Sequence, residues 1–330
     1  TICSGFGEYT QVFKTKDPIL RGSYIEKTKI ISPTEYDFLN ILSLFEEASV
    51  EVCDVRDGCK LAGQGYGVVN IHPGQVQKQL HITATGYKVL KSQSSHAFLL
   101  RPPPTAYLLT AEMRHSLHAA MHTYLENTNG SHYIGMKDLK NKQPPSYTLG
   151  EFSMNEHLHG PSVWLRVGGP LGTTDIDLCF CIQKTQGSVL VPLDPGGCIE
   201  CPKGIHWTES IVQTPHQAPD CQLHIPTGHH KQLFLVLKYI SHLFNKIHWH
   251  VYHKHPYDGL ISSYSYKLLI MHHQKSCTGS DFNVGRCLED VVEYIFNQFG
   301  GDDDNDSYQY MIRYFYKETY LPDTDYPIDR

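Results

Sequence analysis

Two carboxylates stand two residues apart at the start of an apolar stretch. Side chains two apart in a strand point to the same face, so Glu35 and Asp37 would lie side by side. Neighbouring carboxylates repel each other unless a cation lies between them, and Mg²⁺ typically binds one or two carboxylates together with substrate phosphates. The same pattern is typical of a solvated edge strand, so the pair alone does not establish a metal site.

A third carboxylate and a small loop strengthen the case for chemistry. Asp177 interrupts the apolar alternation of residues 176–182, where a charged side chain is costly unless something positive meets it. Upstream, Gly22 and Ser23 offer backbone N–H groups and a hydroxyl that can hold a triphosphate. Two-metal phosphoryl or nucleotidyl transfer requires such a set, with one ion activating the attacking hydroxyl and the other neutralising the triphosphate. Asp175, on the same strand face as Asp177, is the alternative third acid.

The elements that must position these residues are strands and one long helix. We expect strands at residues 35–45, 162–167 and 175–182. A helix should begin soon after Arg101-Pro102-Pro103-Pro104, with Thr110 as its N-cap. Its buried face is predicted to comprise Leu117, Ala120, Met121, Tyr124 and Leu125.

The last third of the chain has a helical pattern. Helices are expected after Thr227-Gly228, from Ser262-Ser263 and from Asp281. The first of them is predicted to bury Leu233, Val236, Leu237, Ile240, Leu243 and Phe244, and the last to enclose Leu288, Val291, Val292, Ile295, Phe296 and Phe299.

A lobe boundary is expected near residue 190. Residues 183–226 are rich in Pro, Gly, Cys and His, which is typical of a hinge. The sequence therefore predicts an α/β (α+β) protein in two lobes, a core lobe at residues 1–190 with a mixed β-sheet and a helical lobe at 191–330.

Composition limits the class of protein. Of 330 residues, 40% are hydrophobic and 19% are charged, which is typical of a folded protein and excludes wholesale disorder. No apolar stretch approaches the roughly 18 residues of a membrane helix, and no secretory leader opens the chain. We therefore expect a cytoplasmic protein without a membrane partner, whose ten cysteines are free thiols. Cys198 and Cys201, in Cys-x-x-Cys spacing without a second pair nearby, are interpreted as ordinary thiols.

Charge is distributed unevenly along the chain. The net charge is −6, which argues against a surface made throughout for nucleic acid. Residues 227–275 hold six Lys and one acid, 6 − 1 = +5, whereas residues 276–330 hold four basic and twelve acidic residues, 4 − 12 = −8. The basic segment is consistent with a solvated helix face or with anion binding. The acidic run Asp302, Asp303, Asp304 and Asp306 is typical of a solvated loop.

The sequence resembles a known family: cyclic GMP-AMP synthase, the cyclic-GMP-AMP-synthase-like receptors and the Mab-21 proteins. Residues 22–38 are similar to that family's Gly-Ser-Tyr-Tyr-Glu … Pro-x-Glu-Phe-Asp block, and the expected helix at residues 108–125 is similar to one that precedes the third acid. The other similar blocks, in chain order, are Gly160-Pro161-Ser162-Val163, Ile176-Asp177-Leu178, Leu237-Lys238-Tyr239, Ser262-Ser263-Tyr264-Ser265-Tyr266-Lys267 and Gly285-Arg286-Cys287-Leu288.

The resemblance implies a bilobal nucleotidyltransferase. In such an enzyme Glu35, Asp37 and Asp177 would hold two Mg²⁺ (or Mn²⁺) ions. By the same resemblance, the triphosphate and a base would be bound by Gly22, Ser23, Lys238, Ser263 and Tyr264, with Tyr264 stacking on the base. An ammonium suits phosphate and an aromatic ring suits a base, so the chemistry agrees with this assignment.

Some features depart from the family. The best match to its Trp-Arg-x-Ser-Phe segment is Trp207-Thr208-Glu209-Ser210, which lacks the base-reading Arg, and Cys179 replaces its Thr. The zinc-binding His-x5-Cys-Cys-x6-Cys segment of the vertebrate enzyme is absent. A sparse set could supply zinc ligands but fits no standard spacing, so no structural zinc is expected. That set is His216, Cys221, His224, His229 and His230.

The function implied by the resemblance is synthesis of a cyclic dinucleotide second messenger from two nucleoside triphosphates, such as ATP and GTP. The family acts in innate immunity when a foreign nucleic acid binds, and without the zinc segment we favour double-stranded RNA over DNA as the activator. Two alternatives remain: a catalytically inactive Mab-21-type interaction protein and a linear oligonucleotide synthase. Only some twenty residues precede Gly22, fewer than the long opening helix of this fold, so we expect a longer natural chain.

Overall fold

The chain divides into two compact units in the computed structural model. The first comprises Thr1–Lys27, Ser32–Ala62 and Tyr66–Gln217, and the second comprises Thr28–Ile31, Gly63–Gly65 and Ala218–Arg330. The structure describes residues 2–30, 35–46, 48–80, 99–100, 107–128, 132–139, 146–184, 188–194, 198, 201–210, 228–252, 263–277 and 284–299.

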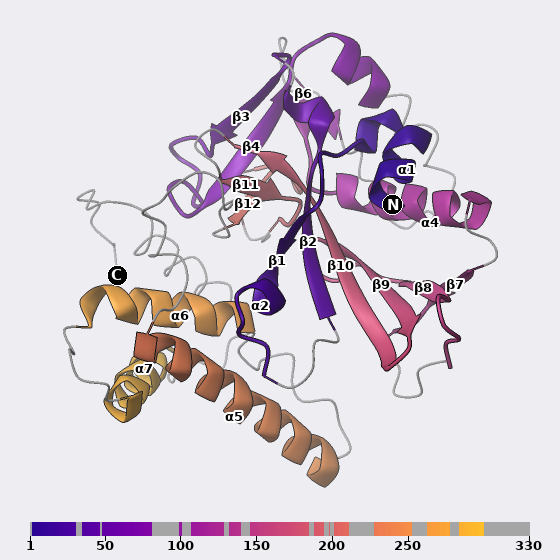
Figure 1. Cartoon of the computed structure of the whole chain (residues 1–330). Coiled ribbons are helices and arrows are strands. Elements are labelled where there is room, and N and C mark those ends of the chain that lie inside the picture. The colour runs from indigo at the N-terminus through magenta and orange to yellow at the C-terminus, as the bar shows by residue number, and fades with distance from the viewer. Residues whose placement is uncertain are drawn as a thin grey trace. The chain divides into compact units, whose positions relative to one another are not determined.

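A mixed sheet forms the first unit (Figure 1). Its strands are β1 (Ile19–Arg21), β2 (Glu35–Ile41), β3 (Val50–Asp54), β4 (Tyr66–Ile71), β5 (Leu99–Leu100), β6 (Tyr107–Leu109), β7 (Tyr133–Lys137), β8 (Phe152–Asn155), β9 (Ser162–Gly169), β10 (Gly172–Gln183), β11 (Val189–Val191) and β12 (Trp207–Ser210). In the described residues the order is β5-β6-β4-β12-β11-β10-β9-β8-β7, with β2 pairing with β1 and β10, and β3 with β4. The β2–β10 and β7–β8 pairs are parallel. The expected α+β class is thereby confirmed.

Alternation along β10 separates the core from the acidic face. Phe180 and Ile182 belong to the large core of the unit, whereas Cys179 and Cys181 belong to a smaller cluster on the other face. Asp177 lies on the same face of β10 as Cys179 and Cys181, because side chains two residues apart in a strand share a face. The position of the third acid thus follows from the same alternation that builds the core.

Helices complete the large core of the first unit. They are α1 (Ile2–Tyr9), the 3-10 helices η1 (Gln11–Phe13) and η2 (Ser43–Glu46), and α4 (Met113–Thr128), whereas α2 (Gly22–Ile25) has no buried residue. Phe6 of α1 lies 5.7 Å from the ring of Tyr124 in α4 and 5.9 Å from that of Phe180 in β10. The predicted buried face of α4 is confirmed for all five residues. The N-cap differs: the Thr110 carbonyl accepts the Met113 N–H at 3.1 Å, while its buried hydroxyl has no partner among the described residues.

The segment expected to be a hinge contributes strands instead. Residues 189–191 pair with β10 and residues 207–210 pair with β4, so both extend the sheet of the first unit. The unit boundary consequently lies between Gln217 and Ala218 rather than near residue 190. These strands are only three and four residues long, too short to produce a periodic signal among the surrounding Pro and Gly.

The described part of the second unit holds residues 28–30 and 63–65 and three helices that pack on one another (Figure 1). The helices are α5 (Gly228–Tyr252), α6 (Ser263–Ser276) and α7 (Val284–Phe299). The predicted face of α5 is wrong in part, since Val236, Ile240 and Leu243 are 38%, 48% and 37% exposed. Leu233 and Leu237 are buried as predicted, Phe234 and Lys238 are buried as well, and the side chain of Phe244 lies outside the described residues. Apolar residues occupy five consecutive positions from 233 to 237, so periodicity could not identify the buried side.

No helix in the described ranges is long and apolar enough to cross a membrane. The proline run at residues 102–104, the acidic run at 302–306, Ser262 and Asp281 lie outside the described residues.

Candidate functional site

The three acids singled out in the sequence come together in the first unit. Parallel pairing of β2 with β10 sets Asp37 beside Asp177 and Glu35 beside Asp175. One carboxylate oxygen from each of Glu35, Asp37 and Asp177 lies within 4.8 Å of the others. A cation among them would bind oxygen ligands only, the chemistry that Mg²⁺ and Mn²⁺ prefer.

Asp177 is the most buried member of this carboxylate triad. Its side chain is 11% exposed, and His159 Nδ1 lies 3.2 Å from its Oδ2. Its Oδ1 is buried without a hydrogen-bond partner among the described residues. Burying a carboxylate oxygen without a partner is costly, and a bound cation would remove that cost. The triad therefore fits a divalent metal, and sequence reasoning missed His159 because it precedes β9 with no recognisable motif.

Asp175 is committed to a different interaction. Arg166 of β9 donates from Nε to Oδ1 at 2.6 Å and from Nη2 to Oδ2 at 2.9 Å. These hydrogen bonds raise the pKa of Arg166. A carboxylate held on both oxygens by a guanidinium is a poor metal ligand, so Asp177 suits the role of third acid better.

Gly22 lies against the Asp37 carboxylate at the start of α2. Its φ is +74°, and a Cβ built there would lie 2.6 Å from Asp37 Cγ, so no side chain fits without displacement. Ser23 follows and is partly buried, and the ring of Tyr24 lies 4.6 Å from that of Tyr36. The small loop expected from Gly-Ser thus lies directly beside the acids.

Cys179 lies on the same face of β10 as Asp177, two residues further along the strand, and is buried. Burial, with a smaller contribution from the charges of Asp177 and Asp37, raises the pKa of its thiol to about 12. The thiol is therefore neutral at physiological pH and is no nucleophile. Its position places a buried, uncharged side chain next to the acids on the same face of β10.

The remaining candidate residues belong to the second unit. Lys238 is buried, and its Nζ donates to the Thr28 carbonyl at 2.9 Å and lies 5.2 Å from the Phe234 ring. Lys238 therefore lies on the buried side of α5, although it was not among the residues predicted to be buried there. Ser263 is the first residue of α6 and is exposed, and Tyr264 is partly buried.

The sparse set of possible zinc ligands, at which no zinc was expected, is described only in part. His216, Cys221 and His224 lie outside the described residues. His229 and His230 form a group with Cys277 and Cys287 whose ligand atoms lie within 4.8 Å of one another. In this group Cys277 Sγ lies 3.9 Å from His229 Nε2 and 3.8 Å from Cys287 Sγ. This second-unit group could hold a metal, and sequence spacing did not join these four residues.

In the segment that best matches the family's base-reading motif, the tryptophan has a structural role. Trp207 is fully buried and its indole Nε1 donates to the Leu109 carbonyl at 2.9 Å. Glu209, two residues on, accepts from Lys184 Nζ at 2.9 Å. These contacts connect β12 to β6 and to the residue after β10, which lie beyond its paired strands β4 and β11.

Comparison with models of known protein families finds no match, and comparison with curated proteins finds none.

Proposed function

We propose that this chain is a metal-dependent nucleotidyltransferase that joins two nucleoside triphosphates into a cyclic dinucleotide. The observation that carries the proposal is the carboxylate triad of Glu35, Asp37 and Asp177, gathered on two parallel strands next to Gly22. The residue blocks that resemble the cyclic GMP-AMP synthase family support the choice of this reaction over other two-metal chemistry.

Each residue of the first unit has a distinct part in the proposed reaction. Glu35, Asp37 and Asp177 would hold two Mg²⁺ or Mn²⁺ ions, which supply activation of the attacking hydroxyl and neutralisation of the triphosphate. Gly22 has no side chain that would displace the Asp37 carboxylate, and Ser23 would offer its N–H and hydroxyl to the phosphate oxygens. His159 positions Asp177 through the contact at Oδ2.

The second unit would supply binding of the nucleotide. Ser263 and Tyr264 begin α6, and we assign Ser263 to the triphosphate and Tyr264 to a base. Lys238 is assigned to the triphosphate. That assignment requires Lys238 to exchange the Thr28 carbonyl for a phosphate oxygen when nucleotide binds.

The activator we propose is double-stranded RNA, in a role of innate immune sensing in the cytoplasm. The support is the surplus of six Lys over one acid in residues 227–275, because lysines bind the phosphate backbone without reading sequence.

A second candidate is a non-catalytic Mab-21-type interaction protein. The buried hydrogen bond from Lys238 to the Thr28 carbonyl favours it, since a lysine used in this way is part of the structure. Retention of three clustered carboxylates favours catalysis, because mutual repulsion would destabilise a site that binds no metal.

One experiment separates these candidates. The protein is incubated with four labelled nucleoside triphosphates and Mg²⁺ or Mn²⁺, with double-stranded RNA, DNA or neither, and products are separated and tested for cyclisation. We expect a cyclic product with RNA, absent from the double variant Glu35→Gln with Asp37→Asn. The matched control is Glu8→Gln with Asp17→Asn, which removes two charges at exposed positions of the same unit. Product from the first double variant, or none from the parent under any condition, would refute the proposal.

A further inference from the structure

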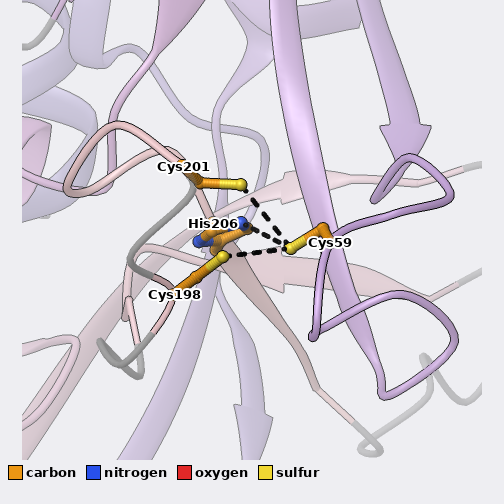
Figure 2. A group of neighbouring side chains, drawn as sticks. All are labelled: Cys59, Cys198, Cys201 and His206. Atoms are coloured by element: carbon orange, nitrogen blue, oxygen red, sulfur yellow. Dashed lines mark hydrogen bonds between the residues drawn. The ribbon is translucent and has the colours of Figure 1, made fainter.

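Three cysteines and a histidine from two distant parts of the sequence meet in the first unit. Cys59 lies between β3 and β4, whereas Cys198, Cys201 and His206 precede β12. Figure 2 shows the side chains of the last three pointing toward Cys59. Cys59 Sγ lies 3.5 Å from Cys198 Sγ, 3.6 Å from Cys201 Sγ and 3.5 Å from His206 Nε2.

These distances match those of a tetrahedral zinc centre. A zinc ion with Zn–S bonds of about 2.3 Å and Zn–N bonds of about 2.0–2.1 Å separates two sulfurs by about 3.8 Å and a sulfur from a nitrogen by about 3.5 Å. All four ligand atoms lie within 4.8 Å of one another. Cys₃His is also a ligand set that structural zinc sites commonly use.

The surroundings of the group are those of a protected metal site. His206 is 2% exposed, and its Nδ1 lies 3.8 Å from Asp194 Oδ1, on the side of the ring away from Cys59. A carboxylate near the other ring nitrogen favours the tautomer that leaves Nε2 free to bind metal. The Leu61 N–H donates to Cys59 Sγ at 3.4 Å, as backbone amides do to metal-bound thiolates. The sulfurs lie against an apolar cluster made of Val55, Leu61, Tyr66, Val68 and Ile205.

A disulfide explains the group less well. Sulfur–sulfur distances of 3.5 and 3.6 Å exceed the bond length of about 2.05 Å. One disulfide would also leave the third thiol and the buried imidazole without a role.

We propose that Cys59, Cys198, Cys201 and His206 bind one Zn²⁺ as a structural site. Four protein ligands leave no open position for water or substrate, so the ion stabilises the fold and takes no part in catalysis. It joins the loop after β3 to the segment before β12, which are 139 residues apart at Cys59 and Cys198. This reverses the expectation that Cys198 and Cys201 are ordinary thiols, and it is independent of the carboxylate triad and of the sparse set that includes His216.

Metal content of the whole purified chain tests the proposal. The protein is purified without chelator, dialysed, and analysed for zinc by mass spectrometry. We expect Cys198→Ser to contain one equivalent of zinc less than the parent, whatever the second-unit group of His229, His230, Cys277 and Cys287 binds. The matched control is Cys53→Ser, which changes a partly buried cysteine packed on the same apolar cluster and should keep the full zinc content.

Cobalt keeps the proposal testable if Cys198→Ser does not fold. In a Cys277→Ser background, which disables the second-unit group, the zinc is exchanged for Co²⁺. We expect visible bands of tetrahedral cobalt and a near-ultraviolet sulfur-to-cobalt band with the intensity of three thiolates. Removing zinc from this protein with a chelator should lower its melting temperature, and adding zinc back should restore it. Three results would each overturn the proposal. The parent protein could contain no zinc after refolding in the presence of zinc, the zinc contents of Cys198→Ser and Cys53→Ser could be equal, or the bound cobalt could be octahedral and show no sulfur-to-cobalt band.

Discussion

Gly22 and Asp37 are in such close contact that a side chain at position 22 would have to displace the Asp37 carboxylate. A Cβ at Gly22 would lie 2.6 Å from Asp37 Cγ, and the backbone φ of +74° is one that other residues adopt at a cost of about 1–3 kcal/mol. Asp37 keeps its position beside Glu35 and Asp177 only if residue 22 has no side chain.

Gly22→Ala should therefore reduce nucleotide product at least about tenfold, equivalent to about 1.4 kcal/mol, because Asp37 must move away from Glu35 and Asp177. Gly135→Ala is the control, since Gly135 has φ +90° but nothing within 4 Å of a built Cβ. Both variants should lose stability from backbone strain, measured by thermal unfolding, but only Gly22→Ala should lose activity. Equal activity of the two variants would show that the contact with Asp37 does not matter.

Asp177→Asn should remove metal binding without destabilising the fold. The parent should melt at a higher temperature with Mg²⁺ or Mn²⁺ than without, because a ligand that binds only the folded state stabilises it. Asp177→Asn should lose this shift and also lower product about 100-fold or more, which corresponds to about 2.7 kcal/mol.

Asp175→Asn provides the contrasting variant. It breaks the ion pair with Arg166. Because the side chain of Arg166 is 13% exposed and that of Asp175 is 27% exposed, the substitution should lower the free energy of unfolding by about 1–3 kcal/mol. Its metal-induced melting shift should persist. If Asp175→Asn lost the shift and Asp177→Asn kept it, Asp175 would be the third metal ligand.

Lys238→Ala should lower the stability of the chain as well as nucleotide binding. The substitution leaves the Thr28 carbonyl without its donor, which costs about 1–3 kcal/mol when the acceptor is buried. Thermal unfolding measures the first effect and labelled nucleotide binding the second, with Lys231→Ala on the same helix as the control. Loss of stability with unchanged nucleotide affinity would favour the non-catalytic candidate.

His118 should make the fold sensitive to acid. Burial lowers its pKa below the ordinary value of 6.5, although its contact with the Asn155 carbonyl at 2.9 Å opposes this shift, and the charges of His115, His122 and His157 lower the pKa further. A group whose pKa is lower in the folded state contributes stability that is full above pH 6.5 and declines as the pH falls toward the folded-state pKa.

The melting temperature of the parent should therefore fall on acidification below that value, and His118→Gln should fall less steeply. His115→Gln is the control, because His115 is on the same helix with a side chain 53% exposed. Parallel curves for the parent and His118→Gln would rule out this role.

The sequence alone indicated the longer helices and strands, and it indicated that Glu35 and Asp37 lie side by side on one strand face. Alternation places residues two apart on one face of β2, and the periodicity of α4 was unambiguous because its apolar residues form one stripe. Strand patterns at residues 162–167 and 175–182 likewise corresponded to β9 and β10. Such features depend on residues that are close together along the chain, so the local sequence is enough to predict them.

Only the tertiary structure decided which distant side chains meet. Asp177 joins Asp37 through the parallel register of β10 with β2, and Cys59 joins His206 across the sheet of the first unit. The buried side of α5, with Lys238 on it, also depended on packing, because an apolar run of five residues has no unique face. Local sequence does not contain these relationships, since strand order and register are set by the total burial of the core and by backbone pairing between segments far apart in the chain.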